Sequence, residues 1–134
     1  MRVLVTGPAG FLGGEITDQL LARGDQVVGV SRGEYPTLAE KGVEYRRGDL
    51  SDVDFTREAI QSVDAVIHTA AVAGVWGPYE SFYRINTQAT LNVIDACKRS
   101  KIRTLVFTSS PSVTFGGEHQ RGVDESEPYP ERYL

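Results

Sequence analysis

The sequence has 134 residues, of which 40% are hydrophobic and 24% are charged, an ordinary composition for a folded domain. The net charge of -4 argues against a general nucleic-acid binder, and no apolar run is long enough to span a membrane. The single cysteine, Cys97, excludes an internal disulfide and a cysteine-based zinc site, and no other metal site is expected. We interpret it as a small buried hydrophobic residue, and a cytoplasmic location fits.

The chain opens with a short strand, a glycine-rich turn and a helix. Residues 3–5 form an apolar run typical of a strand buried on both faces of a parallel sheet. Gly7 would permit a tight turn, Gly10 would let a pyrophosphate approach the backbone, and Gly13 would let the helix pack closely. The helix N-terminus would present free N–H groups to this anion. A glycine-rich turn without a ligand is the alternative.

Helices and strands then alternate along the chain. The first helix is expected to bury Leu12, Ile16 and Leu20 and to end near Gly24. Further strands are expected at 26–30, 43–46, 64–69 and 104–108, further helices at 37–41, 51–61 and 79–100, and a loop from 111 onward. This alternation predicts an α/β fold, a Rossmann-type doubly wound parallel sheet with strand order 3-2-1-4-5. Its ligand crevice would lie at the carboxyl ends of strands 1 and 4.

The end of the second strand distinguishes the two nicotinamide cofactors. A carboxylate there binds the ribose 2′-OH of NAD, whereas an arginine accommodates the 2′-phosphate of NADP. The chain has Ser31 and Arg32 at this place, and Glu34 lies too far along to replace the missing carboxylate. NADP is therefore favoured over NAD. Arg32 as a solvated loop cation is the alternative.

The turn after the third strand carries further candidates. Asp49 and Leu50 follow the third strand, where an Asp either caps the turn or contacts a ligand. Ser51 is expected to be the N-cap of the next helix, with Asp54 completing a capping box.

The fourth and fifth strands end in small or hydroxyl residues. Ala70 and Ala71 leave room for a cofactor after the fourth strand. His68 is expected to pack at the strand end instead of acting as a base, because no carboxylate is evident to orient it. Ser109 and Ser110 follow the fifth strand, where catalytic groups lie in open α/β sheets. A serine-rich turn is the alternative.

The turn TGPAGFLG, which begins at Thr6, resembles the TGxxGxxG motif of the extended short-chain dehydrogenase/reductase family. The segments GVWGPYESFYRIN (74–86), TSSPSVTF (108–115) and RGEYP (32–36) are similar to its 3β-hydroxysteroid dehydrogenase branch, especially 2-alkyl-3-oxoalkanoate reductases and sterol-4α-carboxylate 3-dehydrogenases. The resemblance covers the whole chain, but only the N-terminal part of such an enzyme.

The resemblance implies an NAD(P)-dependent oxidoreductase that transfers hydride between nicotinamide and a secondary alcohol or ketone, either steroid-like or a 2-alkyl-3-keto acid. Ser110 would hold the substrate oxygen, and Asn86 would brace the active-site end of the sheet unless it faces solvent. Trp76 would form an apolar substrate wall or pack against a substrate domain. The partners implied are a small-molecule substrate and a second copy of the full-length parent. The implied cofactor-binding positions are Gly7, Gly10, Phe11, Leu12, Gly13, Ser31, Arg32, Asp49, Leu50, Ala70, Ala71 and Asn86.

The catalytic YxxxK motif of that family is missing, since Tyr129 is followed at the fourth position by Tyr133. We therefore expect residues 1–134 to be a partial dinucleotide-binding domain cut before the catalytic tyrosine, inactive alone and exposed along the fifth strand. Two other functions stay open. One is a nucleotide-sugar epimerase or dehydratase, which would share TGxxGxxG. The other is a dinucleotide-binding sensor without chemistry.

Overall fold

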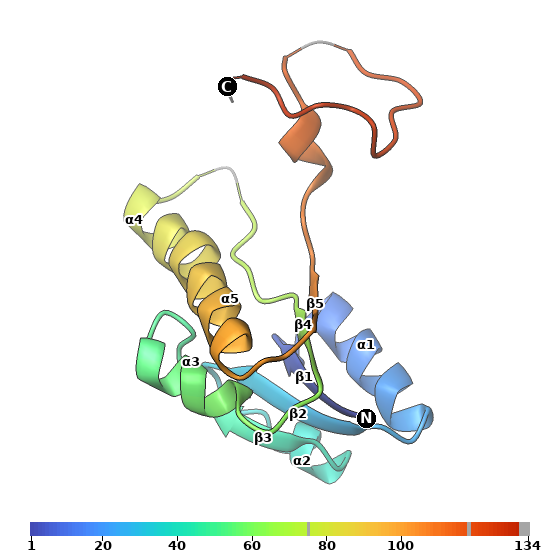
Figure 1. Cartoon of the computed structure of the whole chain (residues 1–134), viewed down its shortest axis with the longest axis vertical. Coiled ribbons are helices and arrows are strands. Elements are labelled where there is room, and N and C mark those ends of the chain that lie inside the picture. The colour runs from blue at the N-terminus through green and yellow to red at the C-terminus, as the bar shows by residue number, and fades with distance from the viewer. Residues whose placement is uncertain (75, 118, 132–134) are drawn as a thin grey trace.

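The computed structural model of the chain describes residues 1–74, 76–117 and 119–131, and Figure 1 shows a parallel sheet with helices on both faces. Tyr133, part of the YxxxK comparison, and Val75, part of the 74–86 segment, lie outside the described residues. The strand order is β3-β2-β1-β4-β5, which confirms the predicted Rossmann-type order. The strands are β1 (Arg2–Thr6), β2 (Gln26–Ser31), β3 (Glu44–Arg47), β4 (Ala65–His68) and β5 (Thr104–Phe107). All neighbouring strands pair in parallel.

The helices lie close to their predicted places. They are α1 (Phe11–Ala22), α2 (Pro36–Glu40), α3 (Val53–Ile60), α4 (Tyr79–Phe82) and α5 (Ala89–Arg99). A π-helical segment, η1 (Tyr83–Gln88), joins α4 to α5, and a 3-10 turn, η2 (Pro111–Thr114), follows β5. The predicted helix at 79–100 is therefore continuous in sequence but contains a wider turn, a feature frequent at functional sites.

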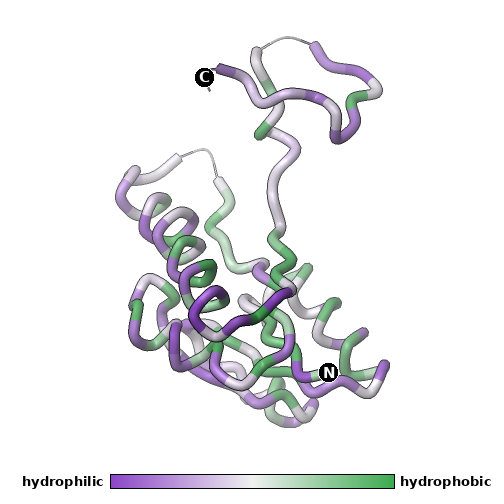
Figure 2. Tube along the Cα trace, in the orientation of Figure 1, coloured by the Kyte–Doolittle hydropathy of each residue, from purple (hydrophilic) through white to green (hydrophobic). Residues whose placement is uncertain are grey.

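Both faces of the sheet are covered, which explains the continuous apolar run of β1. Leu4 belongs to the core that packs against α3 and α5, whereas Val3 and Val5 belong to the core that packs against α1 and α2. Figure 1 places α1 and α5 on opposite sides of the strands. Figure 2 shows hydrophobic residues along the strands, while the segment after β5 is mainly pale or hydrophilic.

Two local predictions about the helices are wrong. Leu12 is 44% exposed, and the buried face of α1 consists of Gly13, Thr17 and Leu20. The reason is that α1 lies very close to the turn before it. Gly13 faces this turn because it has no side chain, and Leu12 therefore points away from the core. The predicted buried stripe thus holds for Leu20 and in part for Ile16, which packs against the core.

The N-cap of α3 is Asp52 and not Ser51. The Asp52 carboxylate accepts hydrogen bonds from the amides of Asp54 and Phe55 at 2.9 and 3.1 Å. The Ser51 amide donates to Asp49 Oδ1 at 2.9 Å, so Ser51 belongs to the preceding turn. A carboxylate also complements the positive end of the helix dipole, which favours Asp over Ser here.

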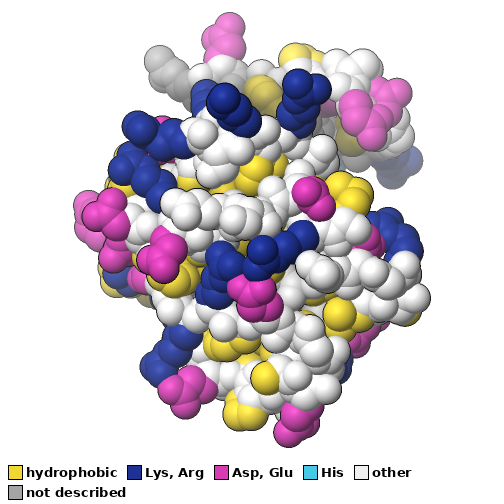
Figure 3. Space-filling model, turned by 60° about the horizontal axis from the view of Figure 1, so that its bottom comes forward, with side chains coloured by type: hydrophobic (Ala, Val, Ile, Leu, Met, Phe, Trp, Pro, Cys, Tyr) yellow, Lys and Arg dark blue, Asp and Glu magenta, His cyan; other side chains and the backbone are white. Residues whose placement is uncertain are grey.

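Charges of both signs are interleaved on the face that carries the amino ends of the strands (Figure 3). Arg2 and Arg46 both pair with Glu44, at 2.5 and 2.6 Å, and Lys41 pairs with Asp18 at 2.7 Å. Within the described ranges, no helix is both long and apolar enough to cross a membrane.

Candidate functional site

A cleft of about 310 Å³ opens at the carboxyl ends of the central strands, where open α/β sheets bind their ligands. The predicted cofactor positions that line it are Gly7, Ser31, Arg32, Asp49, Leu50, Ala70 and Ala71. The predicted positions outside its lining are Gly10, Phe11, Leu12, Gly13 and Asn86. The lining residues that the sequence analysis missed are Val30, Gly33, Tyr35, Gly48, Ile85 and Ala89.

The glycines after β1 meet different structural demands. Gly7 has φ +68°, a left-handed conformation that favours glycine, and its amide donates to the Val30 carbonyl at 2.9 Å. A Cβ on Gly13 would lie 2.2 Å from the Gly7 carbonyl oxygen and 2.9 Å from Thr69 Oγ1, so a side chain cannot fit. Gly10 is exposed, and a Cβ there would lie 3.3 Å from the Gly7 carbonyl oxygen.

The N-terminus of α1 is open to solvent at this turn. Gly10 is its N-cap and makes no side-chain capping bond, and the first turn of the helix contains no acidic residue. Phe11 is fully exposed at the start of the helix. The free N–H groups and the positive end of the helix dipole are therefore available to an anion beside the cleft.

Beneath the cleft, the side chain of Thr6 connects β1 to the loop after β4. Thr6 Oγ1 accepts hydrogen bonds from the amides of Thr69 and Ala70, both at 3.0 Å. The Thr6 hydroxyl proton is therefore directed to His68 Nδ1, 2.7 Å away. Thr69 Oγ1 in turn donates to the Thr6 carbonyl at 2.6 Å. The loop that carries Ala70 is thus fixed to the end of β1.

The imidazole of His68 is a neutral structural group. Because Nδ1 accepts from Thr6, the ring proton lies on Nε2, which is 3.0 Å from Thr90 Oγ1. The ring stacks on Phe107 of β5 with centroids 5.7 Å apart. Burial lowers the pKa of His68 to about 4, so the ring is uncharged at neutral pH. The expectation that His68 packs at the strand end is confirmed.

Asn86 of η1 holds the same loop from the other side. Its Oδ1 accepts from the Val72 amide at 2.8 Å, and its Nδ2 donates to the Val72 carbonyl at 3.0 Å. Thr90 Oγ1 donates to the Asn86 carbonyl at 2.6 Å, which links this contact to His68. Asn86 therefore holds the loop after β4 and does not simply face solvent; its role at the active-site end of the sheet, which the resemblance implied, stays a prediction.

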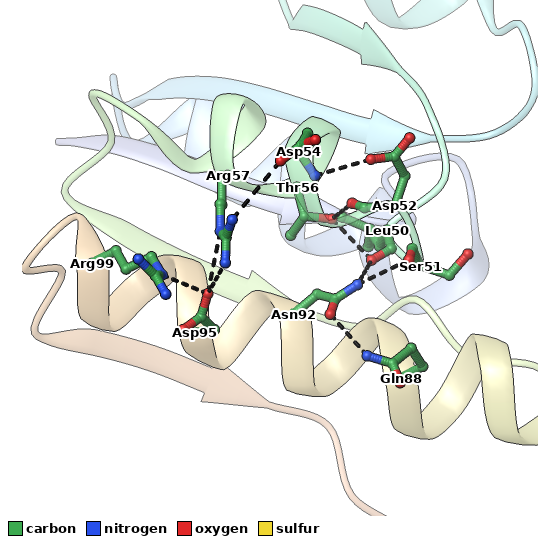
Figure 4. Close-up of polar contacts among 10 residues, drawn as sticks. All are labelled: Leu50, Ser51, Asp52, Asp54, Thr56, Arg57, Gln88, Asn92, Asp95 and Arg99. Atoms are coloured by element: carbon green, nitrogen blue, oxygen red, sulfur yellow. Dashed lines mark hydrogen bonds and ion pairs between the residues drawn. The ribbon is translucent and has the colours of Figure 1, made fainter.

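The wall that contains Leu50 is fixed from two helices (Figure 4). Asn92 Nδ2 donates to the carbonyls of Leu50 and Ser51 at 2.9 and 3.0 Å, and Thr56 Oγ1 donates to the Leu50 carbonyl at 2.9 Å. Gln88 Nε2 donates to Asn92 Oδ1 at 3.0 Å, which orients the buried amide. Asn92 was not predicted from the sequence, although a polar residue among the apolar positions of a helix is a usable signal.

Asp49 lies at the rim of the cleft. Burial opposes its ionisation, but the hydrogen bond from the Ser51 amide and the charges of Arg84 and Arg32 outweigh burial and lower the pKa of Asp49 below its usual range. Arg84 Nη1 lies 3.4 Å from Asp49 Oδ2. The carboxylate is therefore an ionised hydrogen-bond acceptor at neutral pH.

Ser110 lies apart from these groups, after the end of β5. Its Oγ is 2.7 Å from Ser112 Oγ and accepts from the Ser112 amide at 3.3 Å, so it caps the short turn η2. It lines a separate surface hollow with Ser109 and Tyr129. The structure does not bring Ser110 into the cleft, and its catalytic role stays a prediction. Cys97 is buried and burial raises its thiol pKa, in line with a hydrophobic role.

The chain is similar to known oxidoreductases over almost its whole length. Residues 4–134 match the 3-beta hydroxysteroid dehydrogenase/isomerase family. The chain is 47% identical to a 2-alkyl-3-oxoalkanoate reductase of Shewanella oneidensis, over 99% of this chain and 34% of the relative. It is 35% identical to the human sterol-4-alpha-carboxylate 3-dehydrogenase, decarboxylating, over 96% of this chain and 34% of the relative.

Solved structures give the same fold. MoeE5 in complex with UDP-glucose and NAD superimposes with a TM-score of 0.81 at 32% identity, over 97% of this chain and 43% of that chain. The chain thus spans about a third of the length of the curated relatives named above.

Proposed function

The chain belongs to the 3-beta hydroxysteroid dehydrogenase/isomerase family, and we propose that residues 1–134 form a nicotinamide-dinucleotide-binding domain. The observation that supports this best is that the cleft and the open N-terminus of α1 share the turn after β1. Gly7 and Gly10 would hold the pyrophosphate, and Arg32 and Asp49 would lie beside the adenosine. Ala70 and Ala71 would leave room for the rest of the molecule.

The reaction proposed for the whole protein is oxidation or reduction of a secondary alcohol or ketone. The bound nicotinamide would supply the hydride chemistry, while Ser110 would hold the substrate oxygen. Trp76 is 94% exposed on the loop after β4 and would offer an apolar wall to a fatty or steroid-like substrate. Likeness to the 2-alkyl-3-oxoalkanoate reductase favours this class. Nucleotide-sugar chemistry is the second candidate, supported by the likeness to MoeE5 with UDP-glucose and NAD.

The cofactor proposed is NADP. Arg32 lines the cleft and is exposed at the end of β2. Ser31 precedes it, and its hydroxyl contacts the Tyr45 hydroxyl at 2.7 Å. No carboxylate of the described residues lies at the end of β2 to accept a ribose 2′-OH, whereas the guanidinium of Arg32 suits a 2′-phosphate.

Calorimetric titration of the protein with NADPH and NADH tests this proposal. NADPH is expected to bind more tightly, by about tenfold or more, because a charge-assisted contact to phosphate is worth about 1.5–3 kcal/mol. Arg32→Ala is expected to remove most of the difference. Arg103→Ala changes an exposed arginine just before β5, at the opposite edge of the sheet, and should leave both affinities unchanged. Equal affinities in the unaltered protein would exclude the preference, and no binding would exclude the domain's proposed role.

A further inference from the structure

The loop that follows β2 carries two opposite charges, and the structure separates them. Arg32 lines the cleft. The lining continues with Gly33 and Tyr35 and leaves out Glu34, which lies between them in sequence. Glu34 is the acidic residue of the described loop at 31–35, and its side chain is 74% exposed. The Glu34 carboxylate therefore lies outside the cleft that Arg32 lines.

Arg47, the last residue of β3, binds the Glu34 carboxylate outside the cleft. In the sheet register it is the partner of Ser31, so it lies directly beside the loop. Its Nη1 forms a hydrogen bond and ion pair with Glu34 Oε1, and its Nε donates to the Arg32 carbonyl at 3.1 Å. One guanidinium thus contacts both the acidic side chain of the loop and the backbone of the basic residue.

The rest of the loop is fixed to β3 as well. The Tyr45 hydroxyl contacts the Ser31 hydroxyl at 2.7 Å and also contacts the Gly33 carbonyl. The Tyr45 ring meets the Tyr35 ring edge to face, with centroids 6.5 Å apart. Because Tyr45 holds the backbone, loss of Arg47 would free the Glu34 side chain without releasing the whole loop.

We infer that Arg47 is a specificity-determining residue, which neutralises Glu34 and keeps that carboxylate away from the 2′ position of the cofactor. The inference rests on the proposed function. It means that Arg47 affects the choice between NADP and NAD although it does not line the cleft. A carboxylate freed beside Arg32 would repel a 2′-phosphate and would pair with Arg32 in its place. NADH carries no phosphate at its 2′ position, so its affinity should change little.

Titration of four proteins with NADPH and NADH tests the inference: the unaltered chain, Arg47→Met, Glu34→Gln and the double variant. Arg47→Met is expected to lower the preference for NADPH over NADH by about fivefold, the size of a partly screened charge interaction. The double variant is expected to regain the unaltered preference, because Gln has the shape of Glu without its charge. Glu34→Gln alone should change the preference less than about twofold, since Arg47 already neutralises this charge.

Arg46→Met is the matched control. Arg46 precedes Arg47 on β3, but it bonds Glu44 and the carbonyl of Ala59 at 2.8 Å, away from the loop. Its removal should leave the cofactor preference unchanged. Circular dichroism and the melting temperature show whether each variant is folded. If Arg47→Met does not fold, Arg47→Lys replaces it; this variant keeps the charge and should retain most of the preference for NADPH.

The outcomes separate two kinds of failure. An equal loss of affinity for both cofactors in Arg47→Met would mean a purely structural role and would overturn the inference. Failure of Glu34→Gln to restore the preference in the double variant would also overturn it. In both cases tight binding by the unaltered chain would leave the proposed function standing. Absence of binding to the unaltered chain would overturn both.

Discussion

The cleft and the segment after β5 are built in different ways. Three of the turns that line the cleft are held by a buried or half-buried side chain from another element: Thr6 holds the loop after β4, Tyr45 holds the loop after β2, and Asn92 holds the turn after β3. Among the described residues 109–117 and 119–131, Ser110 bonds to Ser112 and Asp124 bonds to Ser126, both contacts between near neighbours in the sequence. In Figure 1 this segment extends away from the sheet.

The two regions therefore depend on different contacts, long-range ones in the cleft and local ones around Ser110. The geometry of the cleft is determined by long-range hydrogen bonds within the five-stranded sheet, so it forms together with the fold. The position of Ser110 depends on the short turn η2, where Ser110 bonds to Ser112, two residues away. Changes to the side chains that hold the cleft should therefore affect folding and binding together, whereas changes in the second region should affect neither strongly.

The largest effect is expected from Gly13→Ala. Its Cβ would lie 2.2 Å from the Gly7 carbonyl oxygen, so α1 or the turn must move. Overpacking of this kind costs about 3 kcal/mol or more, and cofactor binding should disappear with the geometry of the turn. Urea denaturation measures the loss. Gly14→Ala is the control, because its Cβ would lie 3.5 Å from the Pro8 carbonyl oxygen, an ordinary contact.

The pH dependence of stability tests the difference between the two regions, because His68 lies beneath the cleft and His119 lies in the segment after β5. Burial lowers the pKa of His68 to about 4 from an ordinary 6.5, so between these values the unfolded chain binds a proton that the native chain does not. Stability should therefore fall as pH decreases through this range, by up to about 3 kcal/mol. His68→Gln should remove this part of the pH dependence. His119→Gln, in the exposed segment after β5, should retain it; equal slopes in both variants would contradict the assignment.

Gly10→Val separates binding from folding within the first region. Gly10 is exposed and has φ -78° and ψ 170°, which a valine adopts readily. We expect the melting temperature to change little, while affinity for the dinucleotide falls by about a hundredfold, because the side chain occupies the place of the pyrophosphate. Retained affinity would mean that the anion binds elsewhere.

The smallest effect is expected from Ser110→Ala. Ser110 is exposed, and its bond to the Ser112 amide is long at 3.3 Å, so stability should change by less than about 1 kcal/mol. Affinity for NADPH should not change, because Ser110 does not line the cleft. A large loss of affinity would show that the two regions are coupled.

The sequence predicted the strands and helices because apolar runs and helical patterns alternate along it, and the strand order then followed from the rules for parallel βαβ units. It also predicted the roles of Gly7 and Gly13, since local backbone geometry restricts those positions. It misplaced Leu12 and the cap of α3, because burial and capping depend on how closely an element approaches its neighbours. It missed Tyr45 and Asn92, since the backbone groups that they bind are distant in sequence.

The hydroxyl of Thr6 has a consequence for local opening of the fold. Thr69 and Ala70 follow β4, but their amides donate to a buried oxygen of β1 instead of to solvent. Hydrogen exchange at these two amides should therefore require separation of β1 from β4, and their protection should approach that of the central strands. By this measure the loop belongs to the same cooperative unit as the sheet.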